Sequence, residues 1–141
     1  MNGYTMLQYH GAPEPTLPKP DPLPRPSVVT VQDGVAVLYS EDTVPVCGIR
    51  VVHPTNPKAR SVSHSVVMLY VPPQAAMDRH NHETEETYCI LSGSGKLLHD
   101  GGEQMVSAGT FIHLPPWCVH GVVNPGTAMM VALLCTSPPN P

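Results

Sequence analysis

Residues 80–93 read HNHETEETYCILSG, and the first nine of these positions hold two histidines, three glutamates and a tyrosine. This density is unusual in a chain in which only 13% of the residues are charged. In a β-strand, residues i and i+2 point to the same face, so His80 and His82 project together. Glu86 and Tyr88 are also separated from these histidines by an even number of positions. They therefore point to the same face if the strand continues with the same alternation after the acidic turn. Imidazole and carboxylate groups suit a divalent first-row transition metal, although an isolated His-x-His pair is more often simply exposed or packed in a core.

A second stretch, GTFIHLPPWCVHGVVN at residues 109–124, places His120 in another β-rich run. With it, the sequence resembles the cupin superfamily, whose two motifs are G-x5-H-x-H-x3/4-E-x6-G and G-x5-P-x-G-x2-H-x3-N. The resemblance covers about residues 60–136, and several independent spacings agree at once. The matching residues are His80, His82, Glu86 and Gly93 in the first motif, and Gly109, Pro115, His120 and Asn124 in the second.

The resemblance implies that His80, His82, Glu86 and His120 hold one divalent transition metal. The implied fold is a small all-β, double-stranded β-helix (jelly-roll) barrel. Iron is the first expectation for the metal, with manganese, nickel, zinc or copper as alternatives. Three imidazoles and one carboxylate leave two open positions in an octahedral arrangement, unlike a closed four-ligand structural zinc site. Such positions permit Lewis-acid activation of a substrate oxygen, or joint binding of a substrate and dioxygen.

Two positions depart from the motifs. Gln74 stands where the first motif opens with glycine, and Trp117 replaces the glycine of P-x-G. Both are turn positions outside the ligand set, so they leave the metal assignment intact but suggest an altered loop geometry. Trp117 either shapes the mouth of the pocket or packs in the core.

Tyr88 follows the expected ligand Glu86 by two residues and should point into the same interior. Cupin lyases that cleave dimethylsulfoniopropionate use a tyrosine in this relation to the carboxylate ligand as a base, so the resemblance makes Tyr88 a candidate catalytic residue. A phenol with a pKa near 10 needs a nearby cation to serve as a base at neutral pH. The alternative is a tyrosine that packs in the barrel wall with one hydrogen bond.

Three functions remain open, because the fold alone does not determine which reaction a protein catalyses. The favoured one is a metal-dependent dioxygenase or oxidoreductase that acts on a small, largely apolar, chelating substrate. The second is a non-redox lyase, decarboxylase or isomerase with Tyr88 as base, and the third is a ligand-binding cupin without catalysis. Few basic side chains lie near the motifs, which disfavours phosphorylated sugars. The candidate pocket liners are Met68, Tyr70, Tyr88, Ile90, Phe111 and Trp117.

Length and charge restrict the class of protein. A chain of 141 residues fits one domain with a single core. Its net charge is −4, without any cluster of Lys and Arg, which argues against nucleic acid as a partner. No apolar run approaches the roughly 20 residues of a membrane-spanning helix. The first residues lack the pattern of a secretory signal, and the four cysteines show no C-x-x-C spacing, so we expect reduced thiols and a cytoplasmic location.

The chain divides by composition into two parts. Residues 1–27 form a proline-rich N-terminal extension, in which proline excludes helix and central strand. Residues 28–137 form the expected barrel domain, with short β-rich runs separated by turn signals and no stretch of helical period. The first of these runs is VVTV at residues 28–31. The resemblance also favours a homodimer, because a barrel of this size leaves one apolar sheet face uncovered.

Overall fold

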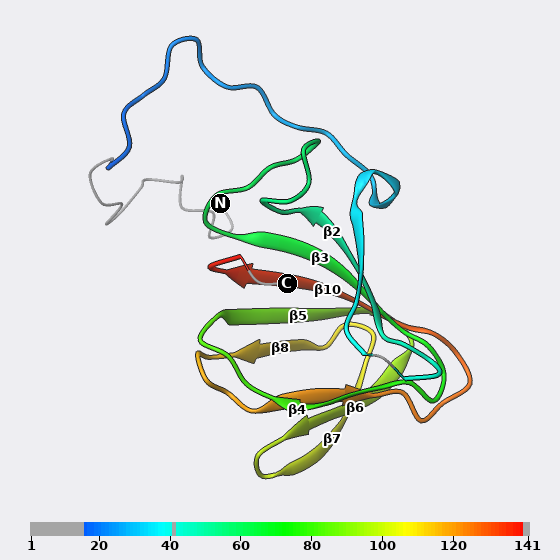
Figure 1. Ribbon diagram of the computed structural model, residues 1–141. Coiled ribbons are helices and arrows are strands. Elements are labelled where there is room, and N and C mark those ends of the chain that lie inside the picture. The colour runs from blue at the N-terminus through cyan, green and yellow to red at the C-terminus, as the bar shows by residue number, and fades with distance from the viewer. Residues whose placement is uncertain (1–15, 41, 140–141) are drawn as a thin grey trace, which may run out of the picture.

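Two antiparallel sheets make up the computed structural model, which describes residues 16–40 and 42–139 (Figure 1). The larger sheet has the strand order β1-β2-β3-β10-β5-β8, and the smaller has the order β4-β9-β6-β7. This is the all-β architecture that the sequence predicts. The strands are β1 (Val35–Leu38), β2 (Cys47–Val52), β3 (Ser65–Val71), β4 (Ala76–His80), β5 (Glu85–Ser92), β6 (Ser94–His99), β7 (Gly102–Ser107), β8 (Phe111–Leu114), β9 (His120–Val123) and β10 (Met130–Ser137).

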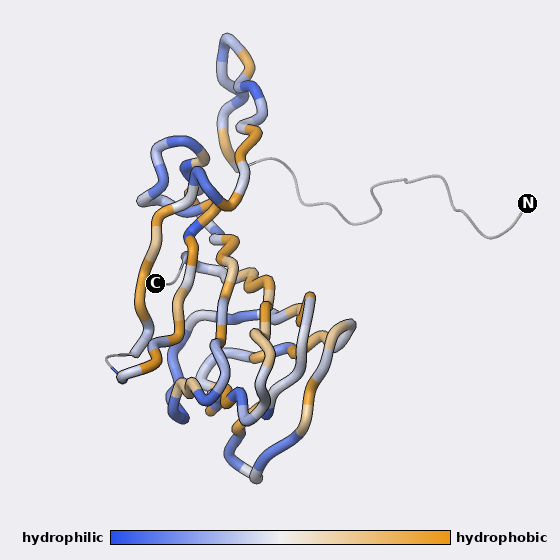
Figure 2. Tube along the Cα trace, turned by 90° about the vertical axis from the view of Figure 1, so that its right-hand side faces the viewer, coloured by the Kyte–Doolittle hydropathy of each residue, from blue (hydrophilic) through white to orange (hydrophobic). Residues whose placement is uncertain are grey.

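The core lies between the sheets, because alternate residues of each strand point inward. Along β3, every second residue from Ser65 to Val71 is buried, and β10 shows the same alternation from Met130 to Thr136. Val122 from β9 and Val106 from β7 complete the core from the smaller sheet. Figure 2 shows apolar residues along the strands and polar residues concentrated in the turns. One hydrophobic interior therefore joins both sheets.

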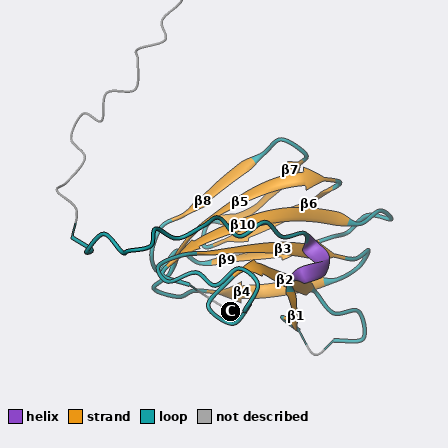
Figure 3. Ribbon diagram, turned by 90° about the horizontal axis from the view of Figure 1, so that it is seen from above, coloured by secondary structure: helices purple, strands orange, loops and turns teal. Residues whose placement is uncertain are grey.

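The segment before β1 differs from the sequence prediction. Residues 16–28 are exposed and contain no strand. Figure 1 shows them as an extended chain above the sheets, and in Figure 3, seen from above, they lead as a loop to the helix. VVTV at residues 28–31 is not a strand. Instead, Thr30 caps a short 3-10 helix, η1 (Val31–Asp33), and its backbone N–H donates to Asp33 Oδ2 at 2.9 Å. Residues 1–15 of the proline-rich extension lie outside the described residues, and the division at residue 27 stays a prediction.

No helix in the described part of the chain is long and apolar enough to cross a membrane.

Candidate metal centre

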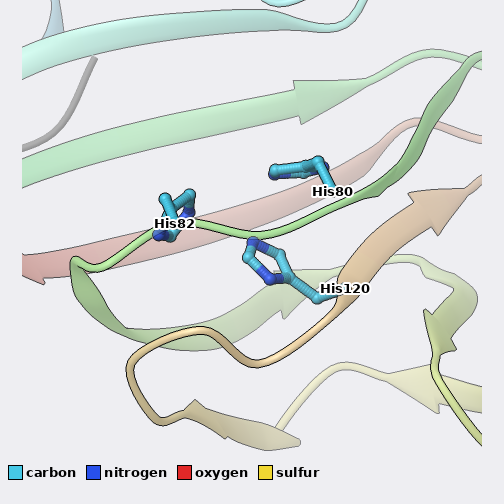
Figure 4. A group of neighbouring side chains, drawn as sticks. All are labelled: His80, His82 and His120. Atoms are coloured by element: carbon cyan, nitrogen blue, oxygen red, sulfur yellow. The ribbon is translucent and has the colours of Figure 1, made fainter.

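Three histidines, two from the neighbouring strands β4 and β9 and one from the loop after β4, point toward one another (Figure 4). His80 ends β4 and His120 begins β9, and the two residues are directly paired across these strands. The pleat of an antiparallel pair turns such partners to the same face. His82 follows in the connection to β5, which then supplies Glu86. The pairing of β4 with β9 thus brings His120 beside His80, whereas His82 joins them from a loop, because residues 81–84 form no strand.

The distances within this group suit a single small cation. The candidate ligand atoms of His80, His82 and His120 all lie within 4.8 Å of one another. Glu86 extends the group, because its Oε2 atom lies 3.2 Å from Nε2 of His120 and 3.4 Å from Nε2 of His82. All four residues expected as ligands therefore come together. Their assignment as ligands stays a prediction.

Each histidine ring is fixed by a backbone carbonyl close to it in sequence. The Nδ1 atoms of His80, His82 and His120 lie 2.7, 2.9 and 2.8 Å from carbonyl oxygens. A carbonyl oxygen only accepts, so Nδ1 donates and carries the proton of the neutral ring. The lone pair then resides on Nε2, the atom that a metal would bind. The accepting carbonyls belong to Asp78, Thr84 and Cys118, in the same order.

Two buried atoms of this centre lack a hydrogen bond. Glu86 Oε2 and His120 Nε2 are fully buried and have no hydrogen-bond partner among the described residues. A carboxylate oxygen in such a place is costly unless a positive charge compensates it. A divalent cation between the imidazole nitrogens and Glu86 would satisfy both atoms at once. The donor set therefore fits the metal that the sequence resemblance implies.

Burial and neighbouring charges act differently on two of the rings. Burial lowers the pKa of His80 below its usual value, which favours the neutral ring that a metal ligand requires. Burial also lowers the pKa of His120, but the proximity of Glu86 and of the Cys118 carbonyl outweighs it and raises the pKa overall. Glu86 thus favours a positive charge on His120 itself in the free protein, a charge that a bound cation would replace.

A cavity of about 500 Å³ opens over the centre. One wall comes from the connection after β1, another from β4, and the rest from β5, β10 and the loop that carries His82. Its lining mixes apolar and charged groups, whereas the sequence suggested a largely apolar pocket. The lining residues are Tyr39, Ser40, Asp42, Ala76, Met77, Asp78, Arg79, His80, His82, Glu86, Tyr88 and Leu134.

Most liners proposed from the sequence lie elsewhere. Of the six, only Tyr88 lines the cavity. Ile90 belongs to the core, and the side chains of Phe111 and Trp117 are 72% and 62% exposed. Sequence reasoning missed Tyr39, which lies outside both motifs. The only sequence feature that could have indicated Tyr39 is the alternating pattern of β1, which continues past Leu38.

The two turn positions that depart from the motifs keep a glycine-like conformation. Gln74 has φ 68° and Trp117 has φ 67°, close to the 76° of Gly93, and no other non-glycine residue in the described ranges has positive φ. Both turns thus have the backbone φ that glycine favours, and an altered loop geometry stays a prediction. The side-chain amide of Gln74 donates to the carbonyls of Pro125 and Gly126, at 3.1 Å each. The backbone N–H of Trp117 donates to the carbonyl of His82 at 2.8 Å, which ties this turn to the centre.

Replacing Trp117 with glycine is expected to stabilise the fold by about 1 kcal/mol. A non-glycine residue in the left-handed region costs about 1–2 kcal/mol, and the greater freedom of glycine in the unfolded chain offsets part of this gain. Trp117→Ala is the matched control, because it removes the same exposed ring and keeps the strain. Urea denaturation measures both variants. A glycine variant no more stable than the alanine variant would refute strain at this turn.

Tyr88 lies on the cavity wall beside the centre. Its side chain is 1% exposed, and its ring stands perpendicular to that of His120 with 6.2 Å between the centroids. Burial, the charge of Glu86 and the nearby Tyr39 raise the pKa of Tyr88 well above its usual value. The free protein thus holds a protonated phenol at this position, and a catalytic role for Tyr88 stays a prediction.

Comparison with protein families and with curated proteins supports the motif assignment. A family model described as "Cupin domain" matches residues 67–136, the segment that contains all four candidate ligands. An uncharacterized protein, MJ1618 of Methanocaldococcus jannaschii, is 33% identical over 81 residues. This match covers 57% of the present chain and 65% of the relative, so the chain spans somewhat less than two thirds of that protein.

Solved structures share the fold at low sequence identity. The polyketide cyclase RemF from Streptomyces resistomycificus superimposes with a TM-score of 0.68 and 19% identity, over 80% of both chains. A predicted oxalate decarboxylase from Thermotoga maritima gives a TM-score of 0.65 and 18% identity, over 78% of this chain and 97% of that one. At such identity these likenesses establish the architecture alone.

Proposed function

We propose that this chain, which belongs to the cupin superfamily, is a metal-dependent enzyme that oxidises a small organic substrate with dioxygen. One observation carries the proposal. The Nδ1 atoms of His80, His82 and His120 are all occupied by backbone carbonyls, which leaves three Nε2 lone pairs for a metal beside an open cavity. Two of these Nε2 atoms, those of His82 and His120, lie 3.4 and 3.2 Å from Glu86. Such preparation of ligands is typical of metal sites and unnecessary for packing.

The protein side chains divide the work between holding a metal and enclosing a substrate. His80, His82, His120 and Glu86 would hold the metal, and the carboxylate of Glu86 would offset part of its charge. When bound, a divalent metal of this type supplies Lewis acidity and, in the case of iron, access to dioxygen chemistry. Met77, Tyr88 and Leu134 present apolar surface that limits the entry of water.

The cavity indicates the size and polarity of the substrate. A volume of about 500 Å³ is typical of sites for small molecules. Asp42, Asp78 and Arg79 line it together with the apolar groups. We therefore infer a substrate that combines a small apolar body with two chelating oxygen atoms, such as an enol, a diol or a β-dicarbonyl compound.

Oxygen consumption tests the reaction class directly. The purified protein is loaded with Fe²⁺ under anaerobic conditions and mixed with a panel of diols and β-dicarbonyl compounds in an oxygen electrode. We expect uptake of dioxygen with at least one chelating compound and none with its methyl ether. Silence across the panel, from a sample whose iron content is confirmed by elemental analysis, would contradict the oxidative reaction.

The position of Tyr88 favours a second candidate, a non-redox lyase, decarboxylase or isomerase. Its ring lies on the cavity wall within two residues of Glu86, where it would exchange a proton with a bound substrate. Turnover of a substrate under anaerobic conditions would identify this class. A ligand that binds tightly and is returned unaltered would instead indicate a binding protein without catalysis.

Tyr88→Phe is expected to lower kcat by about 100-fold or more if Tyr88 transfers a proton, since general acid–base catalysis typically contributes about 10²–10⁴-fold. Metal content should remain that of the wild type, because Tyr88 is not among the expected ligands. Steady-state kinetics and elemental analysis measure the two quantities. Unchanged kcat in the phenylalanine variant would exclude Tyr88 as a catalytic residue.

A further inference from the structure

Tyr39 reaches the cavity from a part of the chain that neither motif includes. It follows β1, and its backbone N–H donates to the carbonyl of Val46 at 2.9 Å, which extends the β1–β2 pairing by one residue. Ser40 and Asp42, which come next, line the same wall of the cavity. All three precede the segment 67–136 that matches the family model. This wall thus comes from the N-terminal hairpin of the larger sheet, outside the matched segment.

The ring of Tyr39 lies directly over the backbone of Gly48 in β2. A Cβ atom at position 48 would meet Cε2 of Tyr39 at 2.4 Å, Oη at 2.8 Å and Cζ at 2.9 Å. Any larger residue would therefore displace the ring. Gly48 leaves the space in which Tyr39 lies.

The hydroxyl group of Tyr39 is buried and has no hydrogen-bond partner among the described residues. Buried tyrosine hydroxyls normally find one. Of the five buried side-chain atoms without a partner in the described ranges, two others are Glu86 Oε2 and His120 Nε2 of the candidate metal centre. Burial, with a contribution from the charge of Glu86, raises the pKa of Tyr39 to about 12, so its hydroxyl is a donor at neutral pH.

The other donors that line the cavity are engaged only in part. The guanidinium of Arg79 donates to the carbonyls of His99 and Gly102, at 3.1 and 3.2 Å. The hydroxyl oxygen of Ser40 accepts the backbone N–H of Val46 at 3.1 Å, which leaves its own O–H free to donate. Tyr39 and Tyr88 are the phenolic donors near Glu86. A dication held by three neutral imidazoles and one carboxylate would keep a net positive charge, which attracts an anionic oxygen to this place.

We propose that Tyr39 is a substrate-binding residue, whose hydroxyl donates a hydrogen bond to an anionic oxygen of the substrate, a carboxylate or an enolate. The inference rests on the proposed function, because it assigns the substrate to the cavity beside the metal centre. It makes the β1–β2 hairpin part of the active site. The unmade hydrogen bond of the free protein is then completed by the ligand.

Binding of a chelating dianion separates this role from a structural one. Co²⁺-loaded protein is titrated with oxalate, and the dissociation constant is followed by the visible absorption of the metal. Tyr39→Phe is expected to keep the Co²⁺ stoichiometry of the wild type. It should weaken oxalate binding about tenfold, which is the effect of losing one hydrogen bond to a charged acceptor. The melting temperature of the metal-loaded, oxalate-free variant should equal or exceed that of the wild type, because the removed hydroxyl has no partner among the described residues.

Two further variants complete the experiment. Gly48→Ala should reproduce the loss of oxalate affinity with the hydroxyl still present, because the new methyl group displaces the ring. Tyr70→Phe is the matched control, since Tyr70 lies on β3 outside the cavity lining, and its oxalate affinity should remain that of the wild type.

Three results would overturn the inference, and they differ in whether the proposed function is excluded as well. If Tyr39→Phe binds oxalate as tightly as the wild type, Tyr39 is no substrate ligand and the proposed function is untouched. If metal-loaded wild-type protein binds neither oxalate nor acetylacetone, the cavity does not bind an anionic oxygen and the role of Tyr39 is excluded. If the wild-type protein takes up no divalent metal, both the proposed function and the role of Tyr39 are excluded.

Discussion

His120→Ala is expected to reduce the bound divalent metal from one equivalent to nearly none. His120 is 1% exposed and its Nε2 atom lies 3.2 Å from Oε2 of Glu86, so the substitution removes a buried donor atom from the centre. The wild-type protein should gain about 2.7 kcal/mol of stability at a metal concentration about 100 times the dissociation constant, and the variant should gain almost nothing. Elemental analysis after dialysis and thermal unfolding with and without metal measure the two effects.

His113→Ala is the matched control for this experiment. His113 lies in the same motif stretch, but its side chain is 58% exposed and its ion pair is with Glu85 at 3.5 Å. Its metal content and its metal-dependent rise in melting temperature should equal those of the wild type. Full metal occupancy in His120→Ala, or an equal loss in both variants, would contradict the assignment of His120 as a ligand.

Gly121→Ala is expected both to destabilise the fold and to weaken metal binding. A Cβ atom at position 121 would lie 2.5 Å from the carbonyl oxygen of Met77, 2.9 Å from the carbonyl carbon of Asp78 and 3.0 Å from the nitrogen of Arg79. These are backbone atoms of β4, where the pairing with β9 shifts register between Met77 and His80. Overpacking of this kind costs about 1–3 kcal/mol.

The effect on the metal follows from the anchor of His80. The displaced segment contains the Asp78 carbonyl, which accepts the hydrogen bond from Nδ1 of His80. Loss of such an anchor typically weakens metal binding by about 10–100-fold. Urea denaturation and a competitive metal titration with a coloured chelator measure stability and affinity.

Gly109→Ala separates the two causes. Gly109 has φ 90°, and a Cβ atom at this position would meet no heavy atom of the described residues within 4 Å, so alanine there introduces strain without a clash. Its metal affinity should match that of the wild type, with a loss of stability of about 1–2 kcal/mol. If Gly121→Ala binds metal as tightly as Gly109→Ala, the approach of β9 to β4 does not position His80.

Local spacing explains why the sequence could predict the metal centre. The first motif sets the spacing of His80, His82 and Glu86, and the second motif places His120 by its distance from Gly109 and Pro115. Strand parity alone does not account for the grouping, because residues 81–84 form no strand. The pairing of His80 with His120 then follows from the fold. The pairing alone is observed, and the identification of these residues as ligands remains a prediction.

Long-range packing explains what the sequence could not predict. Tyr39 reaches the cavity only because β1 pairs with β2 and Gly48 leaves room for its ring. The sequence of the edge strand β7, GEQMVS, shows no apolar pattern, because most of its residues are exposed. Conversely, the apolar run VVTV contributes nothing to the core, since Val28 is 92% exposed. The expected homodimer and the cytoplasmic location stay predictions.

A crystal of the metal-loaded protein, measured on both sides of the absorption edge of that metal, tests the central claim most directly. The account predicts one anomalous-difference peak, within coordination distance of Nε2 of His80, His82 and His120 and of a carboxylate oxygen of Glu86. A peak bound by other residues, or full occupancy in solution without a peak among these four side chains, would contradict it.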